Sequence, residues 1–134
     1  MLVWKEIGRF KNDPEKLEVV ISKLEQDLPE QDKQLFRKPE IREFFIGETA
    51  ESFYQGTKGP AFEGRILFGE MWGFELEDIS MENFYLWHGE LDANVPVSMG
   101  RSMAERIPNC QARLYSEEAH LSLLLGHADE FMMT

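Results

Sequence analysis

The C-terminal part of the sequence alternates strand and helix patterns, and this order restricts the fold more than any other feature. Phe84 to Trp87 form a continuous apolar run that Gly89 follows, which is typical of a strand buried on both faces. A helical pattern then runs from Pro96 to Pro108–Asn109, segment 110–116 predicts a second short strand, and 121–132 predicts a last helix. A strand–helix–strand–helix order predicts an α/β fold with two parallel strands, because a helical crossover returns the chain in the same direction.

The first half of the sequence predicts helices only. Asp13 followed by Pro14 is typical of an N-cap and first helical residue, and the apolar spacing beyond it predicts a helix over 14–27. Further helices are predicted over 29–36, from Pro39 to near Gly56, and over 61–70. The character changes near Ile79, so we expect a helical segment 1–78 and a βαβα segment 79–134 that pack as one body.

Composition excludes several classes of function. The 134 residues are 43% hydrophobic and 12% aromatic, which predicts a single globular domain. A net charge of -11 without a basic cluster argues against nucleic acid or an anionic membrane as a partner. The single cysteine, Cys110, gives no support for secretion, and we find neither a signal peptide nor an apolar run of about 18 residues. We therefore expect a cytoplasmic protein.

Two residues that can carry acid–base chemistry follow the two predicted strands. Asp92 comes just after the first strand, and His120 comes just after the second. Functional side chains of parallel α/β sheets gather beyond the carboxyl ends of the strands, so we expect Asp92 and His120 to lie close together. A carboxylate that accepts the imidazole Nδ1–H fixes the tautomer and stabilises the imidazolium that forms when the ring takes a proton.

From about residue 13 onward the sequence resembles the C-terminal part of a bacterial α/β-hydrolase of the proline-iminopeptidase-like or esterase-like kind. Three stretches carry the resemblance: "WGFELEDI", "LWHGELDANVPVSMGRSMAERIPNCQARLY" and "EEAHLSLL". The resemblance implies that Asp92 is the triad acid, that His120 is the triad histidine, and that the first-half helices correspond to the cap over the active site. We expect no cofactor and no metal. One difference is that residues 116–119 lack the glycines that precede the histidine in the family.

The third member of a triad, the nucleophile, has no match in the sequence. The family places it in a Gly-x-Ser-x-Gly elbow upstream of the part that matches here. Ser98 has Gly100 two residues after it but Pro96 two residues before it, Ser122 follows His120 within a predicted helix, and Cys110 lies at the wrong end of its strand. We reject all three. The resemblance therefore implies a truncated or split hydrolase that hydrolyses an ester or amide only when another chain complements it.

Two other interpretations compete with this hypothesis. The first is a metal site, because alternate residues of a strand share a face and the pattern here is His88, Glu90 and Asp92. The predicted strand ends at Gly89, before two of these residues. We therefore prefer to interpret the stretch as a structural turn. Alternatively, the chain is a non-catalytic oligomerising or binding module. A two-stranded parallel sheet leaves edges unpaired, so we expect strand 84–88 to pair with a second copy of the chain or with an N-terminal half chain.

Overall fold

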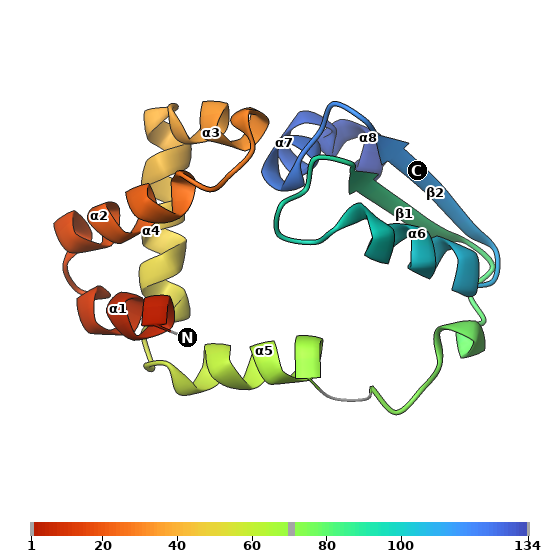
Figure 1. The fold of residues 1–134 in the computed structure, drawn as a ribbon, viewed down its shortest axis with the longest axis horizontal. Coiled ribbons are helices and arrows are strands. Elements are labelled where there is room, and N and C mark those ends of the chain that lie inside the picture. Colours follow the sequence, from red (N-terminus) through yellow and green to blue (C-terminus); the bar gives the residue numbers. More distant parts are fainter. Residues whose placement is uncertain (1, 70–71, 134) are drawn as a thin grey trace. The chain divides into compact units, whose positions relative to one another are not determined.

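The computed structural model describes residues 2–69 and 72–133. The fold is mixed α/β with 60% helix and one small parallel sheet of two strands (Figure 1). The first elements are α1 (Leu2–Phe10), α2 (Pro14–Glu25), α3 (Glu30–Phe36), α4 (Pro39–Ser52) and α5 (Lys58–Gly69). After the short 3-10 turn η1 (Leu76–Asp78) come β1 (Phe84–Gly89), α6 (Val97–Arg106), β2 (Cys110–Tyr115), α7 (His120–Gly126) and α8 (Ala128–Met132).

The chain packs as two compact units. We call Met1–Asp27 with Phe36–Trp72 the helical unit, and Leu28–Leu35 with Gly73–Thr134 the α/β unit. Most of α3, which the sequence analysis assigns to the first segment, therefore belongs to the α/β unit. None of the helices in the described part of the chain is both long and apolar enough to cross a bilayer.

The helical unit has a buried apolar core between α1, α2 and α4. Ile7, Leu17, Val20 and Phe53 form this core, and partly buried side chains of α1 and α4 pack around it. The start of α2 is the predicted one, because Asp13 accepts a hydrogen bond from the Lys16 backbone N–H at 3.2 Å and Pro14 occupies the first turn. The predicted helices of this half are confirmed in outline, although Glu70, the last residue of the fourth, lies outside the described residues.

The α/β unit has the predicted strand–helix–strand–helix order. β1 and β2 pair in parallel from Phe84 opposite Cys110 to Gly89 opposite Tyr115, so both strands end at the same edge of the sheet. α6 makes the crossover and packs against both strands, and α7 packs against β1 (Figure 1). This topology brings together the segments that follow Gly89 and Tyr115. Asp92 lies in the first of these segments, and His120 follows the second.

Two local expectations are wrong. The apolar run predicts that β1 is buried on both faces, but residues 84–88 are only half-buried, because a two-stranded sheet flanked by short helices has little cover. The apolar spacing also predicts a continuous last helix over 121–132. That helix is instead interrupted at His127, which follows Gly126 and joins α7 to α8.

One helix lies outside the predicted set. α1 (Leu2–Phe10) precedes the first helix that the sequence predicts, and its Ile7 is part of the buried core. Val3, Ile7 and Phe10 have helical spacing and could have revealed it.

Candidate active site

Asp92 lies in a tight turn directly after β1, where backbone groups hold its carboxylate. Its Oδ1 accepts hydrogen bonds from the backbone N–H groups of Asn94 and Val95, both at 2.8 Å. Its own N–H donates to the carbonyl of Gly89 at 3.2 Å, so the turn is closed on both sides. Aspartate favours such turns because its short side chain can accept from N–H groups two and three residues further on. One carboxylate oxygen is therefore fixed, and the other is free to face a partner.

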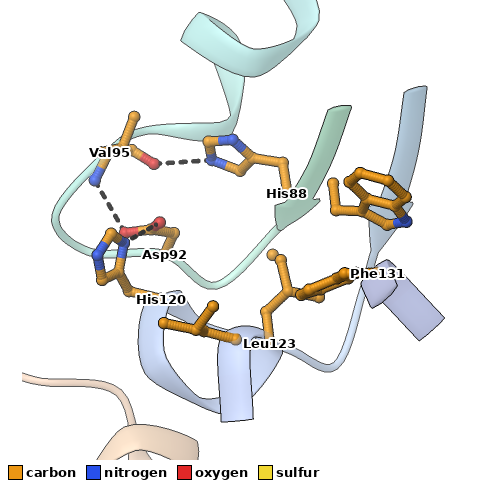
Figure 2. Close-up of a pocket in the computed structure, with 9 residues that line it drawn as sticks. His88, Asp92, Val95, His120, Leu123 and Phe131 are labelled. Atoms are coloured by element: carbon orange, nitrogen blue, oxygen red, sulfur yellow. Dashed lines mark hydrogen bonds and ion pairs between the residues drawn. The ribbon is translucent and has the colours of Figure 1, made fainter. Parts of the chain in front are cut away.

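That partner is His120, the first residue of α7. The Nδ1 atom of His120 lies 2.8 Å from Oδ2 of Asp92, across 28 residues of sequence (Figure 2). The Asp92 side chain is 7% exposed and the His120 side chain is 44% exposed. The structure thus brings together the two residues that the sequence predicts, with the acid buried and the imidazole open to a ligand or a partner.

Opposing influences set the pKa of Asp92. Burial is the largest and raises the pKa, but hydrogen bonds from the Val95 N–H, the His120 ring and the Asn94 N–H lower it and together prevail. The pKa of Asp92 therefore lies below its usual value, and the group is a carboxylate at neutral pH. A carboxylate can only accept, so Nδ1 of His120 carries the proton and Nε2 has a free lone pair in the neutral ring.

The loop before His120 reaches this position without glycines. Backbone carbonyls of this loop and of the end of β2 accept from the segment after β1: the Leu91 N–H donates to the Glu118 carbonyl at 3.0 Å, and the Glu90 N–H donates to the Tyr115 carbonyl at 2.9 Å. Residues 116–119 all have negative φ, so glycine is not required there. Glycine is instead required at position 89. A Cβ on Gly89 would lie 2.4 Å from the Glu118 carbonyl oxygen and 2.6 Å from that of Ala119.

A pocket of about 340 Å³ opens beside the pair (Figure 2). Its apolar walls are the side chains of Trp87, Val95, Leu123, Leu124 and Phe131, while His88, Asp92 and His120 supply the polar groups and Gly89 the backbone. The rings of Trp87 and Phe131 contact each other with centroids 4.9 Å apart. A mostly apolar pocket of this size with convergent polar groups is typical of a small-molecule site.

His88 and Glu90, considered above as metal ligands with Asp92, have other partners. His88 Nε2 donates to the Val95 carbonyl at 2.9 Å, so His88 stabilises the same turn that holds Asp92 (Figure 2). Glu90 pairs with Arg101. Among residues 2–69 and 72–133, no cluster of three histidine, cysteine, aspartate or glutamate side chains has the arrangement of a metal site.

The structure gives a position or a partner for each of the three rejected nucleophiles. Ser98 is an exposed residue of α6, and Cys110 begins β2, at the opposite end of that strand from His120. Cys110 is half-buried, and this burial raises the pKa of its thiol. Ser122 has a local partner, because its hydroxyl accepts the Ala119 backbone N–H at 2.8 Å.

Asp32, a residue of α3, belongs to the surroundings of the site although no sequence pattern predicts it. Its carboxylate accepts hydrogen bonds from the backbone N–H groups of Leu121 and Ser122, the two residues that follow His120. The sequence gives only a weak indication of this contact, since an aspartate in the first turn of a helix is common in any protein. The contact joins positions 89 and 90 residues apart, and no local pattern could indicate it.

Comparison with known proteins gives no relative. No protein-family model matches the sequence, and no curated protein or solved structure is significantly similar to it.

Proposed function

We propose that this chain supplies the acid and the histidine of a serine-hydrolase site, and that another polypeptide supplies the nucleophile. The observation that carries the proposal is the pair itself: a buried aspartate, held by two backbone N–H groups, faces Nδ1 of a half-exposed histidine at 2.8 Å. The pair lies beyond the carboxyl ends of two parallel strands, where α/β enzymes place their chemistry. The resemblance to the last two strands of an α/β-hydrolase supports the same assignment.

In this proposal His120 acts first as a base and then as an acid. A serine hydroxyl attacks the carbonyl carbon of an ester or amide while Nε2 of His120 takes its proton, and Asp92 stabilises the resulting imidazolium. The tetrahedral intermediate collapses when His120 returns this proton to the departing alcohol or amine, which leaves an acyl-serine. Water then attacks the acyl-serine, with His120 again taking and returning one proton, and the acid product and free serine are released.

The pocket favours a substrate with an apolar group. Its five apolar walls, the side chains of Trp87, Val95, Leu123, Leu124 and Phe131, offer no charge to a ligand. The net charge of -11 also disfavours acidic substrates at long range. We therefore propose a neutral ester or amide whose acyl or leaving group is aliphatic or aromatic, and we assign the helices before residue 78 to the cap.

Complementation tests the proposal. The DNA upstream of Met1 is translated in all three frames, and a product with a strand–Gly-x-Ser-x-Gly–helix pattern is co-expressed with this chain. We expect hydrolysis of a neutral butyrate ester by the mixture and by neither chain alone. The His120→Gln variant removes the base and is expected to lower kcat by roughly 10²–10⁴-fold. A complemented mixture that hydrolyses the ester equally well with His120→Gln would contradict the role of His120.

One observation favours a second candidate, a non-catalytic oligomerising module. β1 pairs only with β2 among the described residues, and its side chains from Phe84 to His88 are half-buried. An unpaired strand edge can bind another strand, most simply β1 of a second copy around a two-fold axis. Sedimentation at micromolar concentration separates the outcomes: a dimer that Leu86→Pro converts to a monomer supports edge pairing, and a monomeric wild-type chain excludes it.

A further inference from the structure

Asp32 is the most deeply buried charged side chain in the described residues, and it contacts the helix that carries His120. Its relative exposure is 0%. Its Oδ1 accepts from the Leu121 N–H at 3.0 Å and from the Ser122 N–H at 2.8 Å. Its Oδ2 is buried and has no hydrogen-bond partner within the described residues. A fully buried carboxylate with an unsatisfied oxygen is costly, so the two hydrogen bonds of Oδ1 to α7 must offset part of that cost.

The start of α7 explains what Asp32 does there. The first N–H groups of a helix have no partner within the helix, and an N-cap side chain normally accepts from one of them. Ala119, the N-cap of α7, has no acceptor in its side chain and is 0% exposed. Asp32 therefore performs from α3 the task that the local cap residue cannot perform, and it fixes the backbone on the C-terminal side of His120.

Other contacts fix the N-terminal side of His120. The Ala119 N–H donates to Ser122 Oγ, and the Glu118 carbonyl accepts from the Leu91 N–H beside the Asp92 turn. His120 thus lies between two anchored segments, one tied to the turn that holds Asp92 and the other tied to Asp32. With both anchors in place, Nδ1 of His120 lies 2.8 Å from Oδ2 of Asp92.

We propose that Asp32 is a positioning residue that sets the hydrogen bond between His120 and Asp92. The inference rests on the proposed function for its catalytic meaning, but the positioning itself can be measured without any substrate. Asp32 does not touch the reacting atoms in this scheme. Its effect on chemistry passes through the placement of His120, and a misplacement of about 1 Å can lower a rate by about 10²-fold.

Nuclear magnetic resonance of the full chain tests the proposal. Correlations between the ring nitrogens and ring protons give the tautomer of His120, and a low-field Nδ1 proton reports its hydrogen bond to Asp92. In the wild type we expect the Nδ1–H tautomer. Asp32→Ala removes the anchor and is expected to abolish the low-field proton and to populate both tautomers, whereas Asp32→Asn keeps one acceptor oxygen and is expected to retain the wild-type signals.

A matched control separates positioning from general destabilisation. Ile107→Ala opens a cavity at a buried residue just after α6 and makes no change at α7, so it should lower stability and leave the His120 tautomer unchanged. Wild-type His120 signals in Asp32→Ala, or an equal loss of them in Ile107→Ala, would overturn the proposal. If Asp32→Ala does not fold, the same His120 signals are measured in Asp32→Ser. The serine side chain is shorter than that of aspartate, so its hydroxyl is not expected to reach the N–H groups of α7.

The two proposals fail separately in this design. The tautomer measurement involves no nucleophile, so it can confirm positioning even if complementation yields no hydrolysis. In a complemented enzyme, Asp32→Ala is expected to lower kcat by about 10²-fold with little change in KM, because it misplaces the base and leaves the apolar walls intact. A change in KM alone would place Asp32 in substrate binding and contradict the positioning role.

Discussion

The α/β unit holds two histidines that face carboxylates, and their surroundings differ in a way that separates a candidate site from a structural cluster. His120 faces one carboxylate, Asp92, through Nδ1, and its Nε2 makes no hydrogen bond to any described residue. His127 lies between two carboxylates, with Nε2 3.4 Å from Glu118 and Nδ1 3.3 Å from Glu130. Of these two, only His120 therefore has a ring nitrogen available for proton transfer.

The carboxylates differ as much as the imidazoles. Backbone N–H groups fix Asp92, which is nearly buried, whereas Glu130 is one-third exposed and is shared between Arg113, the Tyr115 hydroxyl and His127. His127 also packs on the ring of Tyr115, with centroids 4.6 Å apart. Both clusters have the residue types of an acid–base pair. Preorganisation and a free nitrogen, rather than composition, mark the His120 pair as the candidate site.

The largest expected effect comes from replacing each histidine by the same residue. In the complemented enzyme, His120→Gln is expected to lower kcat by roughly 10²–10⁴-fold, because the proposed mechanism assigns His120 as the base that takes the serine proton. His127→Gln is expected to change kcat less than about threefold, since it alters only a partly exposed ion-pair cluster. Steady-state kinetics on one neutral ester gives both values, and an equal loss in the two variants would erase the distinction between the two histidines.

A pair of glycine substitutions tests whether the contact between the strand end and the His120 loop is tight. Gly89→Ala would place a Cβ 2.4 Å from the Glu118 carbonyl oxygen, so we expect a loss of about 1–3 kcal/mol in the free energy of unfolding. At Gly47, within α4, an added Cβ would meet no described atom within 4 Å, and Gly47→Ala is expected to gain about 0.5–1 kcal/mol. Urea unfolding measures both, and a neutral Gly89→Ala would show that the loop is loose.

The pH dependence of stability tests the Asp92 carboxylate. Its pKa in the folded chain lies below the ordinary value of 3.8, so the unfolded chain binds a proton more readily as pH falls. The stabilisation by Asp92 is therefore complete well above pH 3.8 and is lost as pH falls through the lower, folded pKa. We expect Asp92→Asn to destabilise the chain by about 1 kcal/mol at neutral pH and by less in strong acid. If Asp92→Asn and wild type differed in free energy of unfolding by the same amount at every pH, the charge of Asp92 would contribute nothing to stability.

Periodicity, caps and strand order are sufficient to predict much of the fold and the central pair. The Asp13–Pro14 cap, the helical crossover after Pro96 and the two strands are local patterns, and their order dictates that Asp92 and His120 meet. Asp32 is out of reach of such patterns because its hydrogen bonds to α7 depend on packing between distant segments. The half-buried state of β1 depends on how many strands and helices pack against it. The apolar sequence of the strand does not give that number.

The smallest expected effect concerns Glu77, an exposed carboxylate held mainly by the side chain of Arg106. Glu77 is 53% exposed, and its hydrogen bond to Arg106 is the largest cause that lowers its pKa from 4.5 to about 2. Salt screens an exposed pair of this kind, so high salt is expected to return the pKa of Glu77 toward 4.5, as Arg106→Gln should do. Asp92, whose carboxylate is held by fixed backbone donors away from solvent, should keep its lowered pKa in the same salt. Carboxyl-carbon resonance titrations at low and high salt compare the two groups, and a salt-sensitive Asp92 would show that its turn is not preorganised.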